Sequence, residues 1–262
     1  MKLLLLLLTP LLLFSKVHYA KVEPMETITL KAAVSAQVTQ TKMVLEGTTV
    51  TGVIIKLDDK LDQIKLTSSR ESLKLVQSMI VTNQSILSAL KQSLNKQKAY
   101  YSRISNIASA SKTQKDNAFY AYTSAKTQYF STKEKIDSLK KQKLDLKYEM
   151  ARLEDSISKK SIKLKNKFLD KLLVSEGDFV NMGTPLAKVQ DLSSAKLVLF
   201  LEAKTLKEIN AKTIYLDDKA TKYKVTKIWK VADEKFISSY RTEITINNPK
   251  ENFSKLLKVE FK

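Results

Sequence analysis

Cysteine is absent from this chain of 262 residues, and histidine occurs only once, at His18. Without cysteine no disulfide bond can hold the fold together, so its stability must come from packing. The same absence excludes a lipid-modified cysteine as a membrane anchor.

Glycine and proline occur four times each, and neither is found between residues 53 and 176. At average usage of roughly 7% glycine and 5% proline, a stretch of this length would contain about ten or more of them. Because both residues break helices, their absence predicts long uninterrupted helices.

The first twenty residues have the pattern of a secretory signal. Lys2 is followed by an apolar run over residues 3–14 and by a polar segment that ends at Ala20. The run is shorter than the ~20 apolar residues that span a bilayer. We therefore expect residues 1–20 to be a signal peptide cleaved near Ala20; the alternative is a retained inner-membrane anchor.

Cleavage near Ala20 would remove His18 and leave a mature chain without histidine or cysteine. Ser-His-Asp triads, Cys-His dyads and zinc sites are then excluded. Two carboxylate clusters could bind a hard cation, although such clusters are far more often solvated turn residues: Asp58, Asp59 and Asp62, and Asp217 and Asp218. We expect no catalytic residue, no metal, no cofactor and no enzymatic activity.

Apolar residues recur at heptad spacing in two parts of the breaker-free stretch. The first register is Leu66, Leu73, Ile80, Leu87, Leu94 and Tyr101, with Val76, Leu90 and Ile104 as companions and polar Asn83 and Gln97 between them. The second is Tyr122, Tyr129, Ile136, Met150, Ile157 and Leu164, with Ala118, Ala125, Leu139, Leu146 and Leu153, interrupted only by polar Lys143 and Thr132. They predict an antiparallel coiled-coil hairpin over residues 61–166.

The heptad phase is lost over residues 105–117, where small polar residues cluster. We expect the turn of the hairpin there. Helices of roughly 40 to 50 residues on either side of it would be about 60 to 75 Å long.

Segments typical of strands flank the predicted hairpin. Residues 28–38 and 49–57 precede it, and residues 168–189 follow it around turns at Gly177 and Gly183. The hairpin therefore interrupts a small β domain whose halves must meet in space. Candidate strands also lie at 196–203, 213–218, 222–231 and 242–248, with a short helix at 205–211, so the fold class is α+β.

Two stretches carry a resemblance to a known family. VSEGDFVNMGTPLAKVQDLSSAKLVLFLEAKTLKEI (174–209) resembles the second lipoyl half-motif and following strand of the periplasmic adaptor, or membrane fusion, proteins of tripartite efflux and secretion systems of the HlyD and RND-adaptor type. SSYRTEITINNPKENFSKLLKVEF (238–261) is similar to the end of that family's β-barrel domain.

The resemblance implies a division of the chain. N-terminal strands and the first half of a lipoyl-like, barrel-sandwich hybrid domain would cover 21–60, the hairpin 61–166, the second lipoyl half 167–192 and a small β-barrel domain 193–262. The lipoyl turns would contain Gly177, Asp178, Gly183 and Pro185. The hairpin replaces the turn that carries a modifiable lysine in lipoyl carriers.

In resistance-pump adaptors the hairpin tip has an arginine, a leucine four residues later and a serine seven residues after that. Those positions align with Tyr100, Ile104 and Ser111 here, and Asp116 also matches. The arginine is thus missing, and Arg103, one helical turn away, is the candidate replacement. Together with Ile107, these residues are the expected partner contact.

The resemblance implies a periplasmic, inner-membrane-associated adaptor of a Gram-negative cell. It would join an inner-membrane transporter of the RND or ABC type to a TolC-type outer-membrane channel and form a ring of copies, a trimer or a hexamer. The alternative is an exported structural coiled-coil protein that binds envelope components or an anionic membrane surface.

After cleavage the chain would carry 44 basic and 27 acidic residues, a net charge of +17 that would also suit nucleic acid or anionic lipid headgroups. The export signal argues against nucleic acid. Tyr101, Tyr122 and Tyr129, which interleave with lysines, lie on the heptad seam and are interpreted as packing residues, with the lysines mostly on solvated faces.

Overall fold

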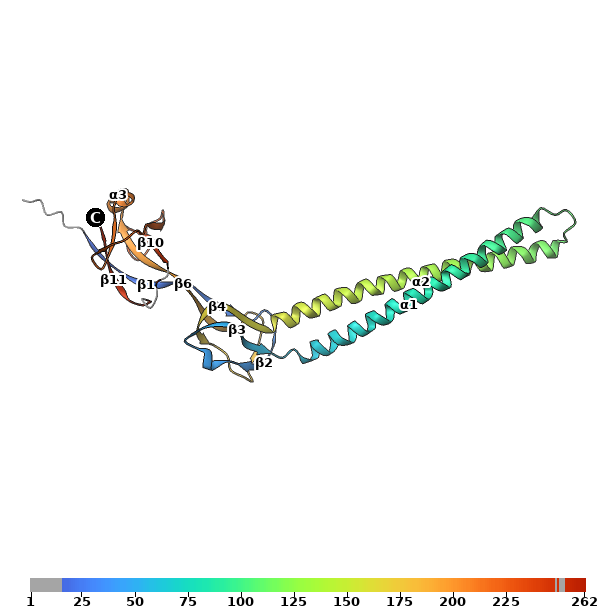
Figure 1. Cartoon of the computed structure of the whole chain (residues 1–262), viewed down its shortest axis with the longest axis horizontal. Helices are drawn as coiled ribbons and strands as arrows, with labels where there is room; N and C mark the ends of the chain where they lie inside the picture. Colours follow the sequence, from blue (N-terminus) through green and yellow to red (C-terminus); the bar gives the residue numbers. More distant parts are fainter. Residues whose placement is uncertain (1–15, 248, 250–252) are drawn as a thin grey trace, which may run out of the picture. The chain divides into compact units, whose positions relative to one another are not determined.

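The computed structural model describes residues 16–247, 249 and 253–262, and the fold is α+β (Figure 1). The chain forms two compact units. The β-rich unit comprises residues up to Ala32, Gln40–Ile55 and Ile162–Lys262, and the hairpin unit comprises Ala33–Thr39 and Lys56–Ser161. No helix in the described part of the chain combines the length and the apolar character that crossing a membrane requires.

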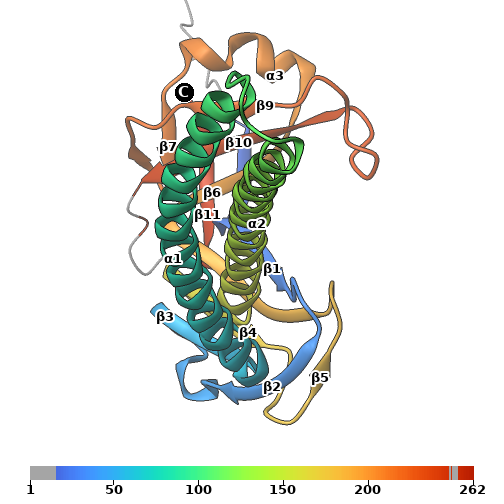
Figure 2. The ribbon, with the colours of Figure 1, turned by 90° about the vertical axis from the view of Figure 1, so that its right-hand side faces the viewer.

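The hairpin consists of α1 (Lys60–Ser105) and α2 (Lys112–Lys159), which lie side by side (Figures 1 and 2). The start of α1 meets the end of α2, because Lys65 binds Glu149 at 2.6 Å and Arg70 binds Glu154 at 2.7 Å. The helices are thus antiparallel. Their buried apolar residues confirm the heptad seam: Leu66, Val76, Ile80, Ala118, Ala125, Ile136, Leu139 and Leu153.

Both predicted ends of the second helix need correction. Residues 112–117 were expected in the turn but are helical, because Ser111 and Gln114 form a capping box that starts α2 at Lys112. Residues 161–166 were expected in the hairpin but begin a strand. There Ile162 and Leu164 alternate with lysines, which suits a strand as well as it continues the heptad.

The strands and short helices follow the expected order, with β1 longer than predicted. They are β1 (Val17–Lys31), β2 (Ala36–Thr41), η1 (Met43–Leu45), β3 (Thr48–Leu57), β4 (Ser161–Leu172), β5 (Phe179–Val180), β6 (Pro185–Glu202), α3 (Ala203–Glu208), η2 (Ile209–Ala211), β7 (Ile214–Leu216), β8 (Lys219–Ala220), β9 (Val225–Ile228), β10 (Ser239–Asn247) and β11 (Leu256–Phe261). Neighbouring strands run β3-β4-β6-β1-β11-β7-β8, and β10 pairs with β6 and β9.

The two predicted halves of the β domain do meet in the β-rich unit. The N–H of Gly47 donates to the carbonyl of Leu169 at 2.8 Å, and the N–H of Leu172 donates to Glu46 Oε1 at 2.6 Å. Strand β4 lies between β3 and β6, so it joins the halves. The sequence predicts that residues near 50–57 and near 173–189 pair in one small β domain. They share one sheet, with β4 between β3 and β6.

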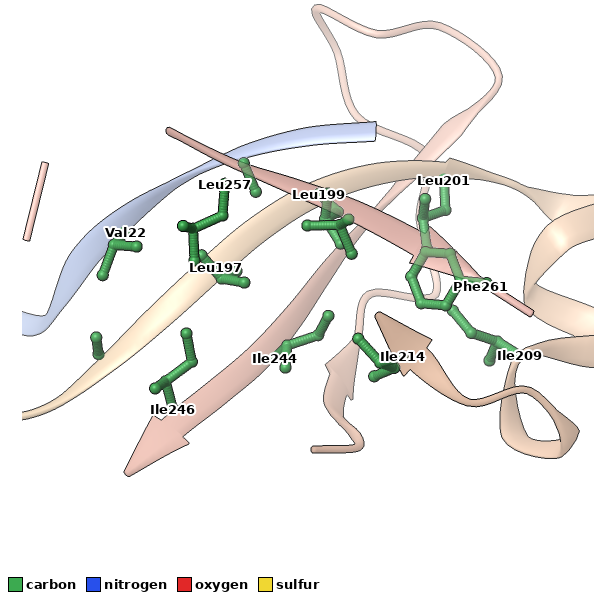
Figure 3. Close-up of a cluster of buried hydrophobic side chains, with 13 residues drawn as sticks. Val22, Leu197, Leu199, Leu201, Ile209, Ile214, Ile244, Ile246, Leu257 and Phe261 are labelled. Atoms are coloured by element: carbon green, nitrogen blue, oxygen red, sulfur yellow. The ribbon is translucent and has the colours of Figure 1, made fainter. Parts of the chain in front are cut away.

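A second buried cluster lies toward the C-terminal part of the same unit (Figure 3). Alternate residues of β6 point into it, because successive side chains of a strand face opposite sides. Leu197, Leu199 and Leu201 meet Ile244 of β10 and Val259 of β11 there. Residues far apart in the sequence thus share one core.

Strand β1 includes residues that lie within the predicted signal peptide. Its pairing with β11 starts at Val17, opposite Glu260, and Ala20 is only 2% exposed. The apolar run of residues 3–14 lies outside the described residues, so signal cleavage stays a prediction. Cleavage after Ala20 would remove the first four residues of β1.

We predict that a chain beginning at Lys21 is less stable than one beginning at Lys16, by at least about 1 kcal/mol. The shorter chain loses the strand pairs of Val17–Ala20 with β11 and the burial of Ala20. Thermal melting of both purified chains checks this, and equal melting temperatures would show that β1 begins to matter only after Ala20.

Gly177 and Gly183 occupy tight turns with φ of 94° and 89°. The Asp178 N–H donates to the Ser175 carbonyl, and the Thr184 N–H donates to the Asn181 carbonyl, so each glycine is the third residue of a four-residue turn. That position of a type II turn requires a positive φ. Pro185 follows directly as the first residue of β6.

We predict that Gly177→Val or Gly183→Val lowers the free energy of unfolding by about 1 kcal/mol or more. A Cβ atom would meet nothing within 4 Å at either glycine, so the cost is one of backbone conformation alone. Asparagine, which tolerates positive φ better, should cost less than valine. Denaturant unfolding of the four single variants tests this, and equal losses for asparagine and valine would contradict it.

Candidate functional site

The last turns before the hairpin tip are held together by aromatic rings. Tyr101 of α1 stacks on Tyr122 of α2 with ring centroids 5.7 Å apart and planes 3° from parallel. Phe119 contacts the same Tyr101 ring at 5.7 Å. These contacts fix the helix ends that present the tip.

Two predicted contact residues lie on the last turns of α1. Tyr100 is 42% exposed. Together with Arg103 it lines a shallow hollow that also includes Lys96, Gln97 and Ala99. The structure therefore brings the aromatic ring and the candidate replacement arginine to one surface.

Ile104 lies on the last turn of α1, and Ile107 and Ser111 lie between the helices. Ile107 is 44% exposed and Ile104 is half-buried. The Ser111 hydroxyl accepts the Gln114 N–H at 3.2 Å, while the Gln114 side chain accepts the Ser111 N–H at 2.9 Å. Ser111 thus caps α2, and Ile107 is the exposed large apolar side chain between the helices. Asp116 lies exposed on the next turn of α2.

Sequence reasoning missed Phe119 at the tip. Its ring is 46% exposed and contacts both Tyr101 and Tyr120. It lies beside the seam residue Ala118, so a search restricted to seam positions passes over it. Large aromatic residues directly next to a seam alanine are the signal that could have identified it.

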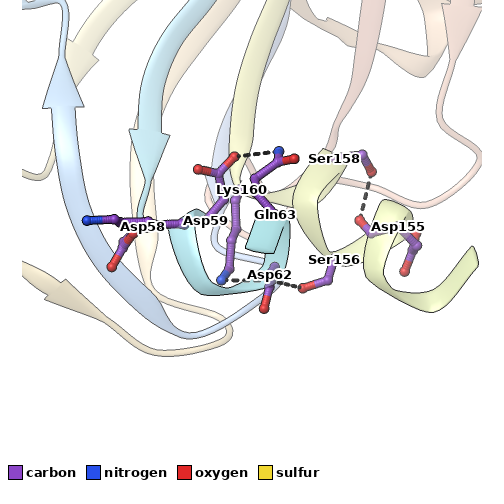
Figure 4. Close-up of polar contacts among 9 residues, drawn as sticks. Asp58, Asp59, Asp62, Gln63, Asp155, Ser156, Ser158 and Lys160 are labelled. Atoms are coloured by element: carbon purple, nitrogen blue, oxygen red, sulfur yellow. Dashed lines mark hydrogen bonds and ion pairs between the residues drawn. The ribbon is translucent and has the colours of Figure 1, made fainter. Parts of the chain in front are cut away.

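The opposite end of the hairpin is closed by a polar cluster (Figure 4). Lys160 Nζ binds Asp62 Oδ2 at 2.9 Å, and the Ser156 hydroxyl donates to the same oxygen at 2.9 Å. The hydrogen bond from Lys160 is the main cause of the lowered pKa of Asp62, and the Ser156 bond adds to it. The Leu57 N–H also donates to the Lys160 carbonyl at 2.8 Å.

These contacts agree with the expectation of ordinary turn carboxylates. Asp58 accepts the Lys60 N–H at 3.1 Å, Asp62 is paired with Lys160, and Asp218 binds Lys258 at 2.7 Å. Within the described residues no group of three or more potential ligands is arranged to hold a metal ion.

His18, which remains within β1, packs its ring edge-on against Phe261 at 5.9 Å. Burial, and then the nearby charge of Lys16, lower its pKa. These contacts assign the chain's only histidine a packing position in the sheet.

Comparison with solved structures gives one fold. The chain matches MacA from Actinobacillus actinomycetemcomitans with a TM-score of 0.73 and 16% sequence identity, over 95% of this chain and 78% of MacA. The chain has the fold of membrane fusion proteins. A MacA-MexA chimera with the α-hairpin domain of Pseudomonas aeruginosa MexA matches at TM-score 0.61 and 15% identity, over 95% of this chain and 81% of the chimera.

The membrane fusion protein Spr0693 from Streptococcus pneumoniae R6 matches at TM-score 0.53 and 9% identity, over 95% of this chain and 98% of Spr0693. No protein-family model matches the sequence, and the search of curated proteins finds no match either. The resemblance inferred from the sequence is thus confirmed in the fold of the structural neighbours.

We predict that Asp62→Asn lowers the melting temperature of the helices by a few degrees at pH 7. The pKa of Asp62 is lowered in the folded chain, so its contribution is present above the ordinary pKa of 3.8 and is lost as the pH falls through the lower folded value. The difference from wild type should therefore shrink as the pH is lowered from 7 to below 3.8.

Circular dichroism at pH 7 and at a pH below 3.8 measures this effect. Asp137→Asn is the matched control, because Asp137 pairs only with Lys140 one turn along the exposed face of α2. An Asp62→Asn melting temperature equal to that of the control at pH 7 would contradict a stabilising role for the cluster.

Proposed function

We propose that the chain is the periplasmic adaptor subunit of a tripartite efflux or secretion pump, a non-catalytic protein associated with the inner membrane. It would bridge an inner-membrane transporter of the RND or ABC type and a TolC-type outer-membrane channel. The observation that carries the proposal is the similarity to MacA, which spans both the hairpin and the β-rich unit over 95% of the chain.

The length of the hairpin supports a bridging role. Helix α1 has 46 residues and α2 has 48. At 1.5 Å per residue each is about 70 Å long. A hairpin of this length can carry a contact surface at its tip about 70 Å from its own base.

We assign the parts of the β-rich unit as follows. Strands β3, β4 and β5 with the first part of β6 form the lipoyl-like part, whose turns contain Gly177, Asp178, Gly183 and Pro185. Residues 193–262 and the start of β1 form the barrel-like part. The hydrogen bonds between Glu46 and Leu172 and between Gly47 and Leu169 support the first assignment, because they close one β structure around an inserted hairpin.

The proposed channel contact is the surface formed by Tyr100, Arg103, Ile104 and Ile107, with Asp116 at its edge. Tyrosine and arginine, the residue types of Tyr100 and Arg103, are enriched among the residues that dominate binding energy. Ser111 contributes by starting α2, since its hydroxyl is used by the cap.

One flank of α1 supports packing of several copies into a ring, a trimer or a hexamer. Met79 and Ile86 are spaced by seven residues and are 45% and 46% exposed. Heptad spacing keeps them on one flank of a coiled coil. A neighbouring hairpin could cover this flank.

We predict that Ile104→Asp combined with Ile107→Asp reduces capture of the outer-membrane channel at least about tenfold, because a charge in a desolvated contact costs several kcal/mol. Crosslinking in cells followed by purification of the tagged chain measures capture. Ile107→Asp alone should show the same direction and leaves the half-buried Ile104 in place.

The matched control is Val81→Asp combined with Leu144→Asp. These side chains are 63% and 65% exposed and lie on the hairpin away from its tip. The control should capture the channel as well as wild type does. Equal capture by the tip variants, at equal protein level and helicity, would mean that the tip does not dock.

A further inference from the structure

The connection between β9 and β10, residues 229–238, exposes several large apolar side chains. We call it the 229–238 loop. Val231 is 79% exposed, Ile237 81% and Phe236 47%. A group of large apolar side chains exposed to water on one loop is typical of a surface that binds a partner or a membrane.

The loop has a defined backbone conformation. The Asp233 Oδ1 atom accepts the N–H groups of Lys235 at 2.9 Å and of Phe236 at 3.1 Å. The Asp233 N–H donates to the Ser239 carbonyl, and the Ser239 N–H donates to the Phe236 carbonyl, both at 2.9 Å. Phe236 also packs against Phe200 of β6 at 4.3 Å between ring centroids. Val231 and Ile237 are therefore presented by an ordered turn.

Cations surround these apolar residues. The segment from residue 221 to 241 has six basic residues, Lys222, Lys224, Lys227, Lys230, Lys235 and Arg241, and two acidic ones, Asp233 and Glu234. One of the acids, Asp233, is engaged by the backbone of the loop. The local charge is therefore strongly positive.

Trp229 stands at the base of the loop between two cations. Lys227 Nζ lies 4.3 Å and Arg241 Cζ 4.7 Å from the centre of its rings. An amphipathic tryptophan with basic neighbours and exposed aliphatic side chains is the combination that settles at the boundary between lipid headgroups and acyl chains.

The described part of the chain begins near the loop, at Lys16. Two residues after Phe200, which contacts the loop, Glu202 binds Lys16 Nζ at 2.5 Å. Glu202 also pairs with Ser239, the residue that follows the loop. The apolar run of residues 3–14 precedes Lys16 in the sequence.

We propose that the 229–238 loop docks the β-rich unit on an anionic bilayer surface. Val231 and Ile237 enter the boundary of the acyl chains, and Lys230 and Lys235 bind headgroup phosphates. This contact is separate from the proposed channel contact at the hairpin tip.

Trp229 is the only tryptophan of the chain, so its fluorescence reports on this loop in the full-length protein. The experiment adds vesicles of phosphatidylethanolamine and phosphatidylglycerol with brominated acyl chains, which quench tryptophan on contact. We expect quenching that weakens as salt is added. Vesicles of brominated phosphatidylcholine should quench far less.

Variants separate the contributions of the loop. Val231→Ser with Ile237→Ser should raise the lipid concentration needed for half-maximal quenching at least about tenfold, since two aliphatic side chains that enter the bilayer are lost. Lys230→Gln with Lys235→Gln should also weaken it roughly tenfold or more. The matched control, Val44→Ser with Phe179→Ser, alters side chains that are 87% and 68% exposed elsewhere in the unit and should quench as wild type does.

Absence of quenching with anionic vesicles would overturn the proposal, as would equal quenching by the Val231→Ser/Ile237→Ser chain. Quenching only when a membrane transporter is present in the vesicles would assign the loop to a protein partner instead. The Ile107→Asp chain should be quenched like wild type, so failure at the tip and failure at the loop are distinguishable.

Discussion

The β-rich unit depends on hydrogen bonds that join segments on either side of the hairpin. The Asn166 N–H donates to the Thr51 hydroxyl at 3.0 Å, and the Leu172 N–H donates to Glu46 at 2.6 Å. Ile54, Leu169 and Leu186 are fully buried in the same unit. With no cysteine in the chain, only this packing and pairing hold the two parts of the sequence together. The positions of the glycine turns and of the hairpin base follow from that closure.

The helices could be predicted because their signals are local and repeated. A long stretch without glycine or proline and a heptad of apolar residues leave few alternatives to a hairpin. The helix ends were harder to predict from the sequence. The cap formed by Ser111 and Gln114 is encoded by two polar residues inside a polar stretch, and Leu164 fits a heptad and a strand equally well. The pairing of β4 between β3 and β6 could not be predicted, since it depends on residues more than a hundred positions apart.

The candidate sites, too, could be predicted from the sequence only in part. The tip could be located from the loss of heptad phase, and Ile107 is exposed there. The capping role of Ser111 and the aromatic contacts of Phe119 required the structure, because each depends on which backbone group or ring lies opposite. The 229–238 loop was hidden because Val225–Ile228 and the apolar residues after it are similar in sequence to one continuous strand.

The hydrogen bond between Leu57 and Lys160 at the base of the hairpin has a kinetic consequence. Contacts between α1 and α2 form outward from a short loop and therefore early, as in other structures dominated by local contacts. Once the helices have paired along their length, the base of the hairpin holds the flanking strands close to each other. Closing the sheet then costs as much entropy as closing a loop of a few residues instead of about a hundred. That change lowers the entropic cost of closing the β-rich unit by about 2 to 3 kcal/mol. The insertion therefore adds little to the entropic cost of pairing the strands, although it separates them by about a hundred residues in the sequence.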